Sequence, residues 1–190
     1  MRQIPRANVY DLRDLQPLTE YRYFLDTNIL KFVFARTGYQ EKSYQTKHYP
    51  AFFKRLMIQK ATIKFTFTQN ILEMFSILDF IEKEQKNLST IKDYRISDLE
   101  TYLNLRQEIF NEIKESLQIF STTIKSEDVS AYLNIDFPID VKDYIYYLHA
   151  NDAKTAFVTD DFEFIYIDGI TMFTANKRAI ETADQYKTLR

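Results

Sequence analysis

The sequence predicts an α/β fold in which a mostly parallel β-sheet is flanked by helices. Short apolar runs, rich in aromatic and β-branched residues, alternate with longer segments of helical periodicity. No obvious tight hairpin joins two of these runs, and strands that are separated by helices usually pair in parallel. With 190 residues, the chain is little longer than one average domain.

The first predicted strand–helix unit follows an N-terminal arm. Residues 1–20 show no clear period, and we expect them to form an extended arm ahead of a single domain over 21–190. The aromatic run 21–25 predicts a strand that ends at Asp26. A helix over 28–35 follows, capped by Asp26 or by the next residue and ended by Gly38.

The middle of the chain predicts a second such unit and then a helical insertion. A helix over 50–59 would carry Pro50 in its first turn. The alternation within 62–67 predicts a strand, after which Thr68 can cap a helix that continues through 84. We expect 84–136 to form an inserted helical arm.

That arm is expected to contain one long helix. Ser97 and Glu100 have the spacing of a capping box, and apolar residues then recur at helical spacing from Leu99 as far as Leu117 and Phe120.

The last third of the chain predicts the remaining strands. Asp140 can cap a helix, 156–159 and 170–174 predict two further strands, and Asn176 can cap a final helix.

The composition restricts the chemistry. Cysteine is absent and there are two histidines, so disulfides, zinc ribbons and thiol nucleophiles are excluded, and any metal site rests mainly on carboxylates. Carboxylate oxygens suit Mg²⁺, Mn²⁺ or Ca²⁺. No apolar run reaches membrane-spanning length, so we expect no membrane association and a cytoplasmic location.

Charge is unevenly distributed along the chain. The net charge is −2, but the segment from Lys31 to Lys64 carries eight basic residues and one acid, a local net charge of +7. Its aromatic residues could stack on bases while its cations hold a nucleic-acid backbone, or they could belong to the core, with solvated lysines on helix faces. The residues expected to contact RNA are Lys31, Arg36, Lys47, Lys54 and Arg55.

Acidic residues occur where parallel sheets place their chemistry, near the carboxyl ends of strands. They are Asp26, Glu73, Asp143 and the pair Asp160–Asp161. Each aspartate could instead serve as a helix cap or as a favourable charge in a first helical turn. Crowded carboxylates repel one another unless a cation neutralises them, and one or two Mg²⁺ or Mn²⁺ ions would do so. Two such ions activate water in phosphodiester cleavage.

Four segments together resemble the PIN-domain nucleases, including the VapC-type toxins. The segments are FLDTNIL (24–30), FTQNILEMFS (67–76), Asp143 and AFVTDDFEF (156–164). The resemblance implies a parallel sheet flanked by helices and Mg²⁺- or Mn²⁺-dependent cleavage of single-stranded RNA. An antitoxin protein and a second copy of the chain are implied as partners.

The resemblance also implies roles for individual residues. Asp26, Glu73, Asp143 and Asp161 match the catalytic, metal-binding acids of the family, and Asp160 is an alternative fourth ligand. Thr27, Asn28 and Thr159 match its polar helpers. The chain departs from the family pattern in its arm over 1–20 and its long insertion over 84–136.

Other functions remain open at this point. The same fold could serve as a non-catalytic module that binds RNA or protein, or as a structure-specific DNA nuclease. A hydrolase with Asp26 as nucleophile would usually carry a second aspartate two residues later, where this chain has Asn28. The most concrete hypothesis is a metal-dependent endoribonuclease, and the resemblance adds the expectation that it is the toxin of a toxin–antitoxin pair.

Overall fold

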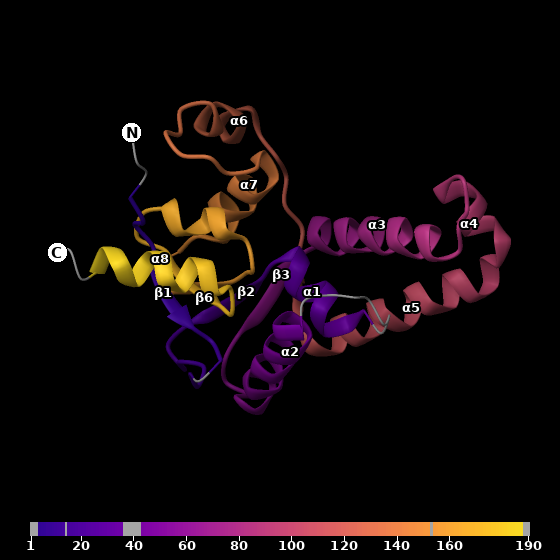
Figure 1. The fold of residues 1–190 in the computed structure, drawn as a ribbon, viewed down its shortest axis with the longest axis horizontal. Coiled ribbons are helices and arrows are strands. Elements are labelled where there is room, and N and C mark those ends of the chain that lie inside the picture. Colours follow the sequence, from indigo (N-terminus) through magenta and orange to yellow (C-terminus); the bar gives the residue numbers. More distant parts are fainter. Residues whose placement is uncertain (1–3, 14, 36–42, 153, 188–190) are drawn as a thin grey trace.

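The computed structural model describes residues 4–13, 15–35, 43–152 and 154–187. Six strands form one sheet in the order β1-β6-β5-β2-β3-β4, and each pairing is parallel (Figure 1). The strands are β1 (Asn8–Asp11), β2 (Arg22–Leu25), β3 (Lys64–Phe67), β4 (Gln118–Phe120), β5 (Thr155–Val158) and β6 (Thr171–Thr174). The predicted α/β fold with a parallel sheet flanked by helices is therefore confirmed.

Helices cover both faces of the sheet. They are α1 (Thr27–Phe34), α2 (Ser43–Ile58), α3 (Thr68–Gln85), α4 (Ile91–Ser97), α5 (Leu99–Ser116), α6 (Ser126–Tyr132), α7 (Val141–Ala150), α8 (Lys177–Lys187) and the 3₁₀ helix η1 (Phe162–Tyr166). Alternate residues of a strand point to opposite faces. Tyr23 and Leu25 accordingly pack in a core with α1, α2, α3 and α5, whereas Phe24 packs in a second core with α7, η1 and α8.

The order in which the chain adds strands to the sheet changes direction between the neighbouring strands β2 and β5. From β2 it proceeds to β3 and β4 on one side, and it later returns to β5 and β6 on the other. Strands β2 and β5 are neighbours, with Leu25 paired to Val158 at their carboxyl ends. Such a switch point opens a crevice outside the carboxyl ends of the strands, where ligands bind in open α/β sheets.

Both edge strands were missed by the sequence analysis. Within 1–20, expected to be an extended arm, residues of β1 pair with β6. Within 84–136, expected to be helical, β4 pairs with β3. The helix predicted to include Leu117 and Phe120 ends at Ser116, because Leu117 adopts an extended backbone and Phe120 enters β4. The central strands are buried along most of their length, whereas β1 and β4 are largely exposed or half-buried, so no continuous apolar run marks these two in the sequence.

Helix boundaries were predicted with mixed success. Asp26 caps α1, and Asn176 accepts hydrogen bonds from the first turn of α8, as expected. The helix expected to begin at Pro50 begins at Ser43 and contains that proline in its interior. The expected helix end at Gly38 lies outside the described residues.

Two predicted caps were wrong. Thr68 is the first residue of α3 rather than its cap, and its hydroxyl donates to the Phe120 carbonyl at 3.4 Å. Asp98, not Ser97, caps α5 by accepting from the Thr101 N–H.

Helices α3, α4 and α5 extend away from the sheet as an arm (Figure 1). A buried charge network holds the arm together, because Arg106 of α5 donates to Asp79 at 2.9 Å and to Glu82 at 3.0 Å, both on α3. Arg95 of α4 also donates to Asp79. None of the helices in the described ranges is both long enough and apolar enough to cross a membrane.

Candidate metal centre

Three of the predicted acids converge at the switch point of the sheet. Asp26 follows β2, Asp161 follows β5, and Asp143 lies in the first turn of α7. One carboxylate oxygen from each can be chosen so that all three lie within 4.8 Å of one another. Asp26 is more than a hundred positions from Asp143 and Asp161 in the sequence, and the fold brings the three together in one acidic cluster.

Asp26 is fixed on both sides of its carboxylate. Its backbone is extended after β2, and its Oδ1 accepts the N–H of Thr27 at 2.6 Å as α1 begins. Its Oδ2 accepts from the hydroxyl of Thr159 at 2.8 Å. The side chain is buried, and this burial, together with repulsion from Asp161 and Asp143, raises its pKa well above the ordinary value.

Asp161 is positioned by the helix that Asp26 caps. The Asn28 amide donates to both carboxylate oxygens of Asp161, at 3.1 and 3.2 Å. The Asp161 N–H donates to the hydroxyl of Thr159 at 3.1 Å. Burial raises the pKa of Asp161, although the hydrogen bonds from its neighbours oppose this effect.

Asp143 enters the cluster because another residue caps its helix. Asp140 accepts from the Lys142 N–H at 2.8 Å, which leaves Asp143 in the first turn of α7 with its carboxylate among those of Asp26 and Asp161. Burial, together with repulsion from Asp161, raises the pKa of Asp143 to about 7.

The three clustered acids line a cavity of about 180 Å³. Glu73 also lines this cavity but does not belong to the tight cluster. Its Oε2 accepts from the hydroxyl of Thr27 at 3.0 Å, and that hydroxyl accepts from the Asn70 amide at 2.9 Å. Its Oε1 accepts from the ammonium group of Lys142 at 3.1 Å. Glu73 is thus already paired with a cation supplied by the chain.

Asp160 points away from the cluster, toward α2. Its carboxylate accepts from the hydroxyl groups of Tyr49 at 2.6 Å and Tyr44 at 3.2 Å. These contacts assign Asp160 a role in holding α2 against the sheet. Asp161, rather than Asp160, is the member of the pair that faces the other acids.

The donor set fits a divalent cation. Mg²⁺ and Ca²⁺ bind oxygen atoms at about 2.0–2.6 Å, so two oxygens on one ion lie at most about 4–5 Å apart. The oxygens of the three-carboxylate cluster lie within 4.8 Å of one another, which is inside the limit set by the longer bonds of Ca²⁺ and slightly beyond the limit of about 4.2 Å set by the shorter bonds of Mg²⁺. Burial and mutual repulsion both raise the pKa values of Asp26 and Asp143, and a cation would relieve the repulsion.

The aromatic residues of the basic segment that the structure describes are mostly buried rather than presented for stacking. The five buried ones belong to the core between α1, α2 and the sheet; they are Phe32, Phe34, Tyr49, Phe52 and Phe53. The alternative interpretation, that these aromatics are core residues, is therefore confirmed for them.

The predicted RNA-contacting cations differ in their surroundings. Lys47 and Lys54 are exposed on α2, and Lys31 lies with its ammonium group 4.8 Å from the ring centre of Phe32. Arg55 instead donates to the Leu12 carbonyl at 2.6 Å, so it has a structural contact. Arg36 lies outside the described residues.

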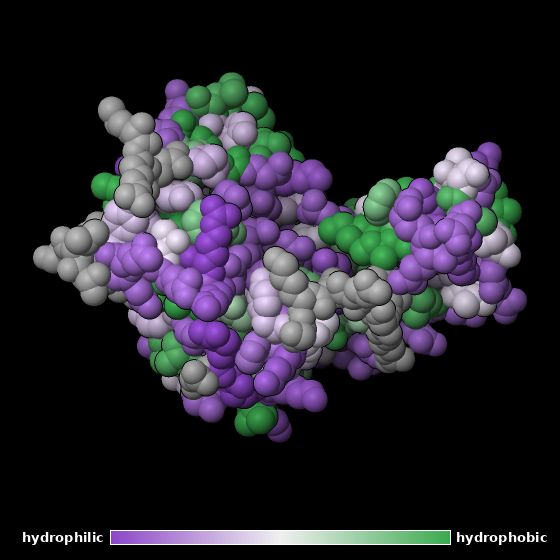
Figure 2. Space-filling model, in the orientation of Figure 1, coloured by the Kyte–Doolittle hydropathy of each residue, from purple (hydrophilic) through white to green (hydrophobic). Residues whose placement is uncertain are grey.

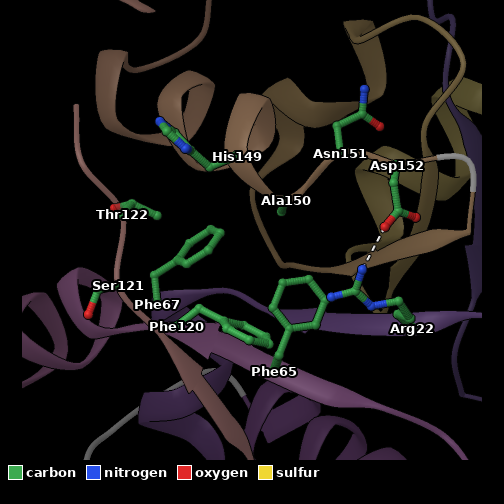
Figure 3. Close-up of a pocket in the computed structure, with 10 residues that line it drawn as sticks. All are labelled: Arg22, Phe65, Phe67, Phe120, Ser121, Thr122, His149, Ala150, Asn151 and Asp152. Carbon is green, nitrogen blue, oxygen red and sulfur yellow. Dashed lines mark hydrogen bonds and ion pairs between the residues drawn. The ribbon is translucent and has the colours of Figure 1, made fainter. Parts of the chain in front are cut away.

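A separate cavity of about 310 Å³ lies at the other end of α7, beside His149 (Figure 3). Figure 3 shows the rings of Phe65, Phe67 and Phe120 along one wall, with the ion pair between Arg22 and Asp152 at one side. The imidazole of His149 lies 3.0 Å from the Asp128 carboxylate. None of the clustered acids lines this cavity.

The fold and the acidic cluster define an α/β protein with a candidate divalent-metal site at a topological switch point. No model of a known protein family matches the chain, and no match to a curated protein was found. The resemblance to the PIN-domain nucleases therefore stays a prediction.

The sequence analysis missed one charged residue of the site, Lys142. It is adjacent to Asp143 in the sequence, but its contact with Glu73 joins α7 to α3 and depends on how those helices pack. Asn70 shares a helical face with Glu73, and this spacing was the available signal for its role in positioning Thr27.

Proposed function

We propose that this chain is a Mg²⁺- or Mn²⁺-dependent endoribonuclease that hydrolyses phosphodiester bonds in single-stranded RNA. The observation that carries the proposal is the convergence of Asp26, Asp143 and Asp161 in one cavity. Bound there, the cation would lower the pKa of water and offset charge on the phosphate.

Each residue of the cavity has a role in this proposal. Asp26, Asp143 and Asp161 bind the cation, and Thr159 and Asn28 hold two of these carboxylates in place through hydrogen bonds. Thr27 positions Glu73, which with the clustered acids makes the cavity selective for cations.

Lys142 supports a phosphate-containing substrate. Its side chain lines the acidic cavity and is more than half exposed, so its ammonium group can reach a phosphate oxygen there. Lys47 and Lys54 add exposed positive charge on α2, which packs against α1. Phosphate contacts of this kind position a nucleic-acid strand without reading its sequence.

The partner and the biological role stay predictions. An antitoxin protein, a homodimer and a role as a toxin were expected from the resemblance alone. They are independent of the metal centre and are not needed for the hydrolytic proposal.

Cleavage of single-stranded RNA in the presence of Mn²⁺ tests the proposal. End-labelled RNA and DNA oligonucleotides of the same sequence are incubated with the wild type, Asp26→Asn, Asp143→Asn and the matched control Asp136→Asn, whose side chain is exposed. We expect the wild type and the control to cleave RNA, and each cluster variant to lose at least about 100-fold in rate. Folding of each variant is checked by circular dichroism.

The outcomes separate the alternative functions. Unchanged cleavage by both folded cluster variants would exclude the acids as the metal site. RNA binding without cleavage by the wild type would favour the non-catalytic module, and preferential cleavage of DNA would favour the DNA nuclease.

A further inference from the structure

The cavity of the candidate metal centre holds both signs of charge. Among the described residues of its lining, Lys142 is the only one with a positive charge. The acids of the lining are Asp26, Glu73, Asp140, Asp143 and Asp161. In two-metal sites, two cations about 3.5–4 Å apart stabilise the attacking and the leaving oxygen. The number of ions that this cavity accepts therefore depends on which acid Lys142 neutralises.

The first turn of α7 directs Lys142 at Glu73. Successive residues of an α-helix point about 100° apart around the helix axis. Asp143 brings its carboxylate among the clustered acids, and Lys142 accordingly points to another side, where its ammonium group donates to Glu73 Oε1 at 3.1 Å. One turn of helix thus supplies a proposed metal ligand and a cation to different parts of the same cavity.

Glu73 has a donor at each of its carboxylate oxygens. Lys142 donates to Oε1, and the hydroxyl of Thr27 donates to Oε2 at 3.0 Å. The hydroxyl of Tyr146 lies 3.5 Å from the same Oε2. Hydrogen bonds to a charged acceptor are strong, so a carboxylate held in this way is satisfied without a metal ion. This agrees with the position of Glu73 outside the tight cluster.

Ions and a substrate can reach the pair. The side chain of Lys142 is 62% exposed and that of Glu73 is 28% exposed. The pair joins α7 to α3, and Figure 2 shows hydrophilic surface on the body of the molecule beside hydrophobic surface over α3. An ammonium group has three N–H donors, of which Glu73 takes one. Lys142 can therefore hold Glu73 and contact a phosphate oxygen at the same time.

We infer that the ammonium group of Lys142 takes the place of a second metal ion, so that the centre binds one divalent cation. A second ion would need a carboxylate outside the cluster, where Asp140 caps α7 and Glu73 pairs with Lys142. The ammonium group would also repel it. One fixed ammonium beside one bound ion gives a phosphate the two cations that a two-metal site supplies. The inference rests on the proposed function and adds to it the number of ions.

A count of bound Mn²⁺ tests the inference in the absence of RNA. The wild type is titrated with Mn²⁺, and electron paramagnetic resonance measures the free ion and detects magnetic coupling between bound ions about 4 Å apart. We expect the wild type to bind one ion without coupling. A wild type that binds a coupled pair of ions, or that binds none, would overturn the inference.

Variants of Lys142 test whether its charge sets the count. Lys142→Met removes the charge and keeps an unbranched side chain, so a second ion should bind beside Glu73 and a coupled pair should appear. Lys142→Arg keeps the charge and should bind one ion. The matched control Lys92→Met, which removes an exposed lysine from α4, should also bind one. A single ion in folded Lys142→Met would contradict the inference.

A double variant locates the second ion. Adding Glu73→Gln to Lys142→Met should return the count from two ions to one, because the second ion loses its carboxylate ligand. A coupled pair that persists in the double variant would show that Glu73 does not hold the second ion, and the inference would fall.

The inference and the proposed function can fail separately. One ion in the wild type and two in Lys142→Met, without RNA cleavage by the wild type, would support the role of Lys142 and exclude hydrolysis. RNA cleavage by a wild type that binds a coupled pair of ions would leave the nuclease proposal standing and exclude the inference.

Discussion

The hydroxyl of Thr159 lies 2.8 Å from Oδ2 of Asp26, to which it donates a hydrogen bond, although 133 positions separate the two residues. The same hydroxyl accepts the N–H of Asp161 at 3.1 Å. Both Thr159 and Asp26 are buried. One hydroxyl therefore links the ends of β2 and β5 and sets the relative positions of two proposed metal ligands.

Replacing Thr159 should loosen this link. Thr159→Val keeps the shape of the side chain but leaves the Asp161 N–H without its acceptor, so we expect a loss of about 1–3 kcal/mol in the free energy of unfolding. Mn²⁺ binding should weaken as well, while Thr159→Ser should resemble the wild type in both respects. Urea unfolding and calorimetric Mn²⁺ titration measure the two effects, and a valine variant with wild-type values would refute the positioning role.

The raised pKa values predict a stability that depends on pH. The carboxyl of Asp143 has a pKa of about 7 in the folded chain and an ordinary value of 3.8. Between these values the folded chain binds more protons than the unfolded chain, so its free energy of unfolding falls as pH rises. The slope from one such carboxyl is at most about 1.4 kcal/mol per pH unit.

Mn²⁺ should act in the opposite sense, because it binds the deprotonated carboxylates. We expect the increase in melting temperature on adding Mn²⁺ to be larger at about pH 7.5 than at about pH 5.5. Asp143→Asn should reduce both the pH dependence of the metal-free protein and the effect of Mn²⁺. An Mn²⁺ effect that is independent of pH would argue against binding at these acids.

Lys142 should compete with the metal for negative charge. Its ammonium group pairs with Glu73 at 3.1 Å, and this pairing raises the pKa of Lys142. Lys142→Met should therefore tighten Mn²⁺ binding by about fivefold, while the free energy of unfolding changes by less than about 1 kcal/mol because the pair is partly exposed. Lys142→Arg retains the charge and should bind Mn²⁺ as the wild type does. Weaker Mn²⁺ binding by the methionine variant would contradict this account.

The arm should depend on its buried arginine. Arg106→Met would leave Asp79 and Glu82, both buried, without their shared donor, and we expect a loss of about 3–5 kcal/mol in the free energy of unfolding. Replacing all three residues by apolar ones should recover much of that loss. Chemical denaturation measures the free energy of unfolding of both variants. If Arg106→Met lost no more stability than the triple variant, the buried network would not be what holds the arm together.

The fold was largely predictable because its central strands are strongly marked. The aromatic run before Asp26 and the run before Thr159 are buried on both faces, and each ends at an acid or a polar residue. Because the carboxyl ends of parallel strands meet at one edge of a sheet, Asp26 and Asp161 could be placed near each other from sequence alone. The four-residue strand β1 and the three-residue strand β4 are formed by pairing with their neighbours, which local periodicity does not reveal.

Side-chain direction was the part of the site that sequence could not supply. Asp160 and Asp161 are adjacent and chemically identical, and only the packing of Tyr49 on one side and Asn28 on the other separates their roles. The pairing of Lys142 with Glu73 similarly requires α7 and α3 to be in place. The resemblance matched acids to positions, whereas the donors around each acid come from tertiary structure.

The most direct test of the central claim is a crystal of the protein grown with Mn²⁺ and measured at a wavelength where manganese scatters anomalously. The account predicts an anomalous peak bonded to carboxylate oxygens of Asp26, Asp143 and Asp161. Ordered carboxylates with no peak between them, or a peak bound only elsewhere on the molecule, would contradict it.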